Sequence, residues 1–116
     1  MSRPLQIAIV GLGSMGRRRK AIVQALHPDW QVVGYDAETS RSEYIGVLYN
    51  LLTWADAAMI CSPAPAHLNA LKLCGKLHLP CFAEKPLVAV DQIDSFVLHC
   101  PPLHEHCAVG FSYRFH

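Results

Sequence analysis

The sequence predicts an α/β fold, a doubly wound parallel sheet formed by one domain that spans residues 1–116. Short, β-branched apolar runs alternate with longer segments whose apolar residues recur at helical spacing. A glycine-rich turn, residues 11–16, directly follows the first apolar run. Strands and helices that alternate in this way favour parallel strands joined by right-handed crossovers.

The first three elements are expected to form a βαβ unit. Residues 5–10 form a nearly continuous apolar run ended by glycine, which is typical of a buried parallel strand. Residues 14–26 show helical spacing, and His27-Pro28-Asp29 ends this helix. Residues 31–35 predict a second strand, which ends at Asp36.

The rest of the chain continues the alternation. Residues 37–50 predict a short helix and a small strand, and Trp30 and Trp54 are expected to pack beside strands. The helix over 66–77 places Leu68, Leu71 and Cys74 on one face. The other expected elements are strands at 57–61, 80–83 and 107–111, and a helix capped by Asp91 that ends before Pro101.

Composition narrows the classes of partner. The chain is 52% hydrophobic and 16% charged, which suits a sheet covered on both faces or a surface that contacts a partner. A net charge of +1 gives no basic excess, which argues against nucleic acid as a partner, and no apolar run is long enough to span a membrane. Five cysteines without an export signal predict free thiols in a reducing cytoplasm.

The glycine turn has the pattern Gly-x-Gly-x-x-Gly between a strand and a helix, as in a Rossmann fold. Gly11 permits the tight turn, Gly13 lets the backbone approach a pyrophosphate, and Gly16 lets the helix pack on the sheet. Ser14 and the N–H groups around Met15, in the first helical turn, would bind the anion. The alternative is a glycine-rich turn in some other α/β protein.

Asp36 predicts which dinucleotide binds. Its carboxylate would accept hydrogen bonds from the adenosine ribose hydroxyls and repel a 2′-phosphate, so NAD is favoured over NADP. The basic run 17–20 offers an alternative, since an arginine there could turn towards a 2′-phosphate. The favoured interpretation of this run is a solvated helix face.

Three further motifs carry a family resemblance. They are Pro63 with His67, Glu84-Lys85-Pro86, and the segment 109–115 that reads Val-Gly-Phe-Ser-Tyr-Arg-Phe. Together with the glycine turn, they resemble the N-terminal domain of the glucose-fructose oxidoreductase, inositol dehydrogenase and MocA (Gfo/Idh/MocA) family. The resemblance implies an oxidoreductase that transfers hydride between NAD(P) and a hydroxyl of a sugar, cyclitol or related metabolite.

The resemblance also implies roles for individual residues. Ser62, Pro63 and His67 would line the nicotinamide half of the cofactor. Glu84 and Lys85 would lie at the nicotinamide and the substrate, and Lys85 would donate or accept the proton of the substrate hydroxyl. Ser112 stands where family members often carry Asn, and is expected to keep a polar contact.

The sequence departs from the family in two larger ways. The segment 36–54 is shorter than usual, which predicts a shallow or incomplete adenine side. The family's C-terminal domain is absent, and with it most of the substrate pocket and a common oligomer interface. The chain alone is therefore expected to be catalytically incomplete. The alternatives are a stand-alone NAD-binding, sensing or assembly module, which would form a homo-oligomer through its last strand, and a remnant that has lost cofactor binding.

Histidine and cysteine residues gather near the end of the sequence and invite a zinc hypothesis. Their spacing fits no standard ligand pairing, and Pro101-Pro102 interrupts them, so no metal is expected. The residues concerned are His99, Cys100, His104, His106, Cys107 and His116.

Overall fold

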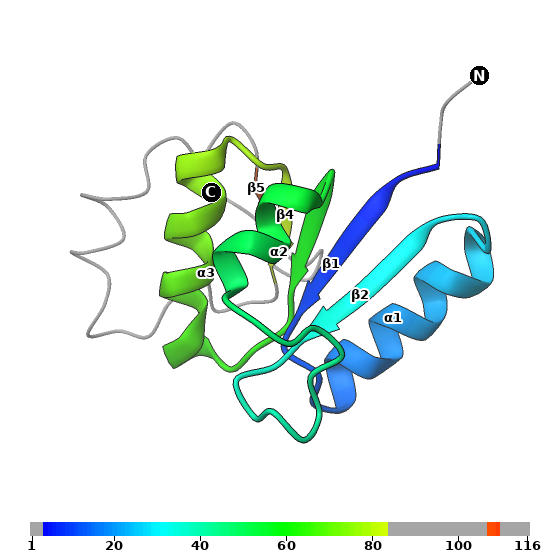
Figure 1. Cartoon of the computed structure of the whole chain (residues 1–116), viewed down its shortest axis with the longest axis horizontal. Helices are drawn as coiled ribbons and strands as arrows, with labels where there is room; N and C mark the ends of the chain where they lie inside the picture. The colour runs from blue at the N-terminus through cyan, green and yellow to red at the C-terminus, as the bar shows by residue number, and fades with distance from the viewer. Residues whose placement is uncertain (1–3, 84–106, 110–116) are drawn as a thin grey trace.

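A computed structural model describes residues 4–83 and 107–109, which form a five-stranded sheet in the order β2-β1-β3-β4-β5 (Figure 1). Every pair of neighbouring strands is parallel. The strands are β1 (Gln6–Val10), β2 (Gln31–Tyr35), β3 (Ala57–Ile60), β4 (Cys81–Ala83) and β5 (Cys107–Val109). The predicted doubly wound parallel sheet is therefore confirmed.

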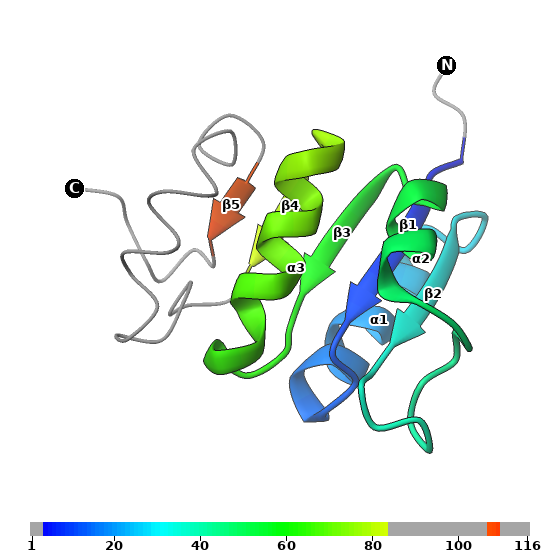
Figure 2. The same cartoon turned by 60° about the vertical axis from the view of Figure 1, so that its left-hand side comes forward.

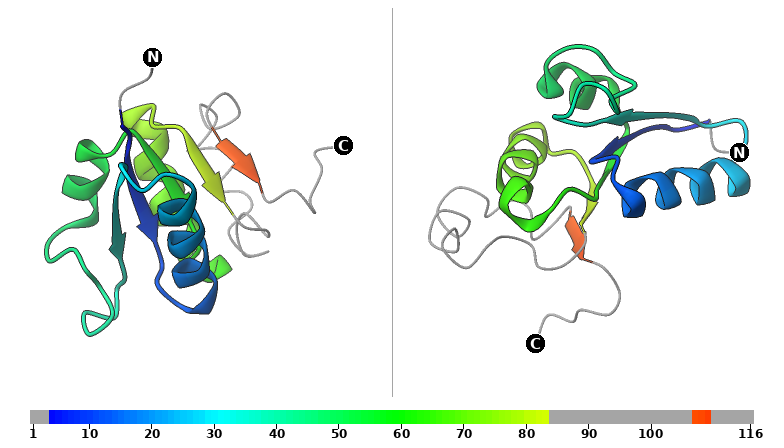
Figure 3. Two further views of the ribbon diagram at one scale, coloured as in Figure 1. Left: turned by 90° about the vertical axis from the view of Figure 1, so that its right-hand side faces the viewer. Right: turned by 90° about the horizontal axis from the view of Figure 1, so that it is seen from below.

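The helices lie on both faces of this sheet (Figure 3). Helix α1 (Ser14–Leu26) covers one face, while α2 (Leu48–Trp54) and α3 (Ala64–Leu77) cover the other. Figure 2 shows α2 and α3 on the same side of the sheet, in front of β1, β3 and β4. Alternate residues of β1 consequently point into different cores.

The larger core lies between the sheet and helices α2 and α3. Ala8 and Val10 of β1 belong to it, together with fully buried leucines of both helices, Leu51, Leu52 and Leu71. The smaller core contains Ile7, Ile9, Leu12 and Val32, and the partly buried Trp30 packs against it. Trp54 packs against the larger core, so both tryptophans have the packing role that was expected of them.

Helix α1 contributes little to the smaller core. Gly16 is its one buried residue, and Val23 packs against the cluster from a partly buried position. Met15, Ile22 and Leu26 are 37%, 44% and 70% exposed. Helical spacing was therefore a correct guide to the helix, but most of its apolar residues do not form a buried face.

The segment after β2 differs from the expectation for residues 37–50. Residues 37–47 form turns and bends without a strand, and the helix starts only at Leu48. The loop instead folds back along the open edge of β2. The carbonyl oxygen of Gly34 accepts from the N–H groups of Glu43 and Tyr44 at 3.0 Å, and the Gly34 N–H donates to Glu43 Oε1 at 2.8 Å.

The other expected elements agree with the structure where it describes them. Helix α3 begins two residues before the predicted 66, Leu71 and Cys74 are fully buried, and Leu68 packs beside them. The predicted helix after Asp91 and the end of the last strand lie outside the described residues. None of the helices in the described part of the chain is long and apolar enough to cross a membrane.

Candidate nucleotide-binding site

The carboxyl ends of β1, β2 and β3 surround a cleft of about 490 Å³. The chain leaves β1 towards β2 and returns to the other side of β1 as β3, so this cleft lies where the direction of strand order reverses. Ligands of open parallel sheets bind at such a point. Seven of the predicted site residues line it: Gly11, Gly13, Ser14, Met15, Asp36, Ser62 and Pro63.

Two glycines of the turn are required by packing within the chain. Gly11 has φ +100°, and a Cβ there would lie 2.5 Å from the Ser62 nitrogen. A Cβ on Gly16 would collide with the carbonyl oxygen of Gly11. The turn therefore fits tightly between α1 and the segment that follows β3, as the glycine pattern predicted.

Gly13 is different, because the fold itself leaves space beside it. No atom of the described chain lies within 4 Å of a Cβ built on Gly13. Gly13 is the N-cap of α1, no side chain caps the helix, and its first turn contains no acidic residue. The unpaired N–H groups of that turn are thus available to an anion, and the missing side chain keeps the approach open.

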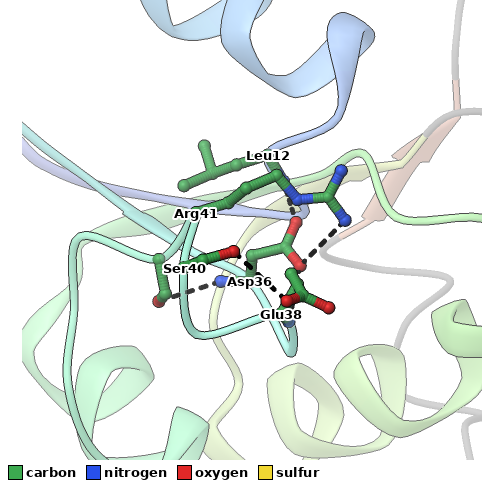
Figure 4. Close-up of polar contacts among 6 residues, drawn as sticks. Leu12, Asp36, Glu38, Ser40 and Arg41 are labelled. Atoms are coloured by element: carbon green, nitrogen blue, oxygen red, sulfur yellow. Dashed lines mark hydrogen bonds and ion pairs between the residues drawn. The ribbon is translucent and has the colours of Figure 1, made fainter.

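Asp36 directly follows β2, lines the same cleft as the glycine turn, and is only 9% exposed. Its Oδ2 accepts from the Leu12 N–H at 2.7 Å and its Oδ1 from the Glu38 N–H at 2.8 Å (Figure 4). Burial raises the pKa of Asp36, but these hydrogen bonds and the Arg41 charge outweigh burial and lower it below its ordinary value. The carboxylate is therefore ionised at neutral pH and fixed in place.

Arg41 is a site residue that sequence reasoning missed. Its guanidinium lies 3.4 Å from Asp36 Oδ1, its side chain is 50% exposed, and it lines the cleft. It belongs to the loop that folds back along β2. The one signal in the sequence was a cation in the polar segment after Asp36, and helical or strand periodicity could not place it there.

Ser62 contributes a polar atom from the third side of the cleft. Its Oγ is shielded from solvent and has no hydrogen-bond partner among the described residues. A shielded hydroxyl without a partner is uncommon in folded proteins and suits a site that a polar ligand completes. Together with the open position at Gly13, it leaves both space and an unpaired polar atom for a ligand in the cleft.

The remaining predicted site residues stay predictions. His67 lies in the first turn of α3, and its contact with the nicotinamide stays a prediction. Glu84, Lys85 and Ser112 lie outside the described residues. So do most of the histidines and cysteines of the zinc hypothesis, and no group of metal-ligating side chains occurs within the part of the chain that is described.

Comparison with known proteins finds solved structures of the same fold. The structure matches a myo-inositol dehydrogenase from Corynebacterium glutamicum, with a TM-score of 0.81 and 21% identity over 97% of this chain and 38% of that one. The structure also matches a scyllo-inositol dehydrogenase from Lactobacillus casei that was solved with NAD(H) and scyllo-inositol. The TM-score is 0.74 and the identity 19%, over 94% of this chain and 36% of that one. A Gfo/Idh/MocA family oxidoreductase from Vibrio cholerae matches with a TM-score of 0.71 and 24% identity, over 92% of this chain and 38% of that one. The chain shares the fold of these dehydrogenases.

The fold that the motifs implied is thereby confirmed. The chain spans between 36% and 41% of the length of the solved structures it matches. No family model matches the sequence, and no curated protein is similar to it.

Proposed function

We propose that residues 1–116 are the dinucleotide-binding domain of an NAD(P)-dependent oxidoreductase of the Gfo/Idh/MocA type. The observation that carries this proposal is the shared cleft, in which an ionised Asp36 faces a glycine turn with an open approach at Gly13. The dehydrogenases of similar fold support the same class of cofactor, since one of them was solved with NAD(H).

Each group in the cleft has a role in this proposal. The N–H groups of the first turn of α1 and the Ser14 hydroxyl bind the pyrophosphate, with Met15 beside them. Asp36 accepts hydrogen bonds from the adenosine ribose, which favours NAD. Ser62, Pro63 and His67 hold the nicotinamide half. When bound, the cofactor accepts or donates the hydride.

The substrate proposed is a sugar, a cyclitol or a related metabolite. Solved structures of similar fold include inositol dehydrogenases, and the Glu84-Lys85-Pro86 motif supports the same class of reaction. Lys85 would move the proton of the substrate hydroxyl, with Glu84 and Ser112 close to the cofactor. The chain alone is proposed to bind cofactor without turnover. Polyol oxidation by the isolated chain that Lys85→Ala abolishes would contradict this part.

Gly13→Ala tests cofactor binding at the position that the fold leaves open. A methyl group there meets no atom of the described residues beyond its own chain neighbours. In the proposed complex it would obstruct the approach of the pyrophosphate. We expect titration calorimetry to show NAD binding to the wild-type chain, and at least about tenfold weaker binding to the variant, as for loss of one charge-assisted hydrogen bond.

The melting temperature provides the control for this variant. It should stay nearly unchanged, because the small loss in capping at the helix start is offset by the lower entropy of the unfolded chain. Equal NAD affinity in the two chains, or no binding to either, would reject the proposed function.

A cytoplasmic location is proposed as well. Cys74 is fully buried and forms no disulfide bond. Buried thiols of this kind are usual where the compartment is reducing.

A further inference from the structure

An apolar groove of about 320 Å³ lies on the face of the sheet that carries α1, beside that helix and over β3 and β4. Its lining is apolar apart from the Cys81 thiol, with Val23 contributed by α1 and Trp30 by the turn before β2. It shares no lining residue with the nucleotide cleft. The strands form its floor, which includes Ile7, Ala57, Met59 and Phe82.

Exposed side chains of α1 extend this apolar surface. Arg19 lies on the groove side of the helix, because its guanidinium carbon is 5.7 Å from the centre of the Phe82 ring. Ile22 and Leu26 follow at helical spacing on the same side of α1, and they are 44% and 70% exposed. Contiguous apolar surface of this kind on a folded domain marks an interaction site.

One face of the sheet carries fewer helices than the other. Among the described residues, α1 is the one helix on this face, whereas α2 and α3 lie on the opposite face (Figure 3). Parallel sheets are normally covered by helices on both faces. Residues 84–106 lie outside the described part of the chain. Because β5 continues the strand order beyond β4, the right-handed rule predicts their crossover on the face of α3. We therefore expect this segment to leave the groove open.

The position of the groove suits one further helix. Helix α1 packs over β1 and β2, while β3 and β4 follow β1 on its other side. Two strand spacings, about 10 Å, separate β1 from β4. Helices that pack side by side lie about 8–10 Å apart. A helix laid over β3 and β4 would therefore contact the floor of the groove and the flank of α1 together.

The charges of α1 decide what kind of helix fits. Residues 17–20 read Arg-Arg-Arg-Lys, and α1 contains no aspartate or glutamate. Arg18 precedes Ile22 by four positions, so it borders the same apolar stripe as Arg19. A second copy of α1 in the groove would bring like charges together. A helix with carboxylates along one edge would instead meet these two guanidinium groups.

We propose that this groove docks an amphipathic helix of a partner protein. The apolar stripe of that helix packs on Met59, Phe82 and the exposed Ile22, and its carboxylates face Arg18 and Arg19. Helix-in-groove recognition of this kind uses apolar side chains at i, i+3, i+4 and i+7. The inference goes beyond the proposed function and does not depend on it, because the groove and the nucleotide cleft are separate.

A synthetic helical peptide of about four turns is the probe, with leucines at this spacing and glutamates along one flank. Fluorescence anisotropy with the 116-residue chain should give a dissociation constant of about 100 µM or tighter. The same peptide with lysines in place of the glutamates should bind at least about tenfold more weakly. Backbone resonances of Val23, Trp30 and Phe82 should shift on binding, and that of Gly13 should not.

Variants on α1 separate the apolar contact from the charges. Ile22→Asn should weaken binding of the glutamate peptide at least about tenfold, and the fold should persist because the position is exposed. Arg18→Glu combined with Arg19→Glu should reverse the preference, so that the lysine peptide binds more tightly. Gln24→Glu is the matched control, since Gln24 is exposed on α1 and lines a different cavity. It should change neither affinity.

Several outcomes would overturn the inference. One is absence of binding by the glutamate peptide, and another is equal binding of the two peptides. A dimer in sedimentation that Ile22→Asn dissociates would assign the groove to a second copy of the chain. Nuclear Overhauser contacts between Met59 and residues 84–106 would assign it to that segment. NAD should bind equally to wild type and Ile22→Asn, so failure of the peptide tests would leave the proposed function intact.

Discussion

At the scale of single residues, Gly13 and Gly16 are three positions apart, but they are glycines for different structural reasons. Gly16 is required by the fold, because any Cβ would strike the Gly11 carbonyl oxygen. Gly13 is not required by packing, because its surroundings within the described chain are empty. The sequence pattern predicted all three glycines of the turn together. Only the structure separates the position that has open space beside it from the positions needed for packing.

Asp36 connects the stability of the domain to pH. Its pKa is lowered in the folded state, so its ionised form stabilises the fold above its unfolded-state pKa of about 3.9. This contribution is lost as the pH falls through the lower, folded-state pKa. Asp36→Asn should therefore reduce the melting temperature at pH 7, and the difference from wild type should shrink below about pH 4.

Thermal melts of both chains between neutral and acidic pH would check this. Asp29→Asn serves as the control, because Asp29 is exposed in the turn after α1. A difference for Asp36→Asn that stays constant over the whole range would show that the charge of Asp36 does not stabilise the fold.

At the scale of elements, the loop after β2 takes the place of an outer strand. It satisfies Gly34 on the open edge of β2 through Glu43 and Tyr44, and the Ser42 hydroxyl accepts from the Asp36 N–H at 3.0 Å. These bonds occupy the N–H and carbonyl groups of Gly34, through which another chain could otherwise pair with the edge. The same loop brings Arg41 to Asp36, so the protection of the edge and the shape of the site depend on one segment.

Substitution of Glu43 tests the role of this loop. Glu43→Ala leaves the Gly34 N–H without its acceptor and should cost about 1–2 kcal/mol in the free energy of unfolding. Glu43→Gln keeps an acceptor oxygen and loses only the ion pair with Lys20, which is partly exposed and worth at most about 1 kcal/mol. Urea unfolding would measure both. Equal losses would assign the effect to the ion pair instead of the strand edge.

This loop also shows where sequence patterns stop being informative. Strands β1 to β4 and helix α1 follow from apolar runs and helical spacing, because burial dictates those patterns. The polar residues 37–47 are held by hydrogen bonds between side chains and backbone, and such bonds leave no periodicity in the sequence. The position of Arg41 beside Asp36 could not be predicted for the same reason.

At the scale of the whole molecule, the two faces of the sheet are unequal. Helices α2 and α3 bury leucines fully against one face, while α1 lies on the other with most of its apolar residues exposed. The larger core should therefore dominate the stability of the domain. Helix α1 should add little to this stability, and its main role should be to place its first turn at the cleft.

Two leucine truncations compare these contributions. Leu71→Ala removes a fully buried side chain from α3 and should cost about 2–5 kcal/mol in the free energy of unfolding. Leu26→Ala, at a position 70% exposed on α1, should change it by less than about 0.5 kcal/mol. Denaturant unfolding checks both values. Similar losses at the two positions would contradict the described packing.

The central claim is that the glycine turn and Asp36 bind one dinucleotide between them. Nuclear magnetic resonance of the ¹⁵N-labelled chain during a titration with NAD tests it most directly, because each backbone N–H reports its own surroundings. We expect saturable shifts at Gly13, Ser14, Met15 and Asp36, with little change at Leu26 at the far end of α1. Shifts confined to other parts of the chain, or no shifts at saturating NAD, would contradict it.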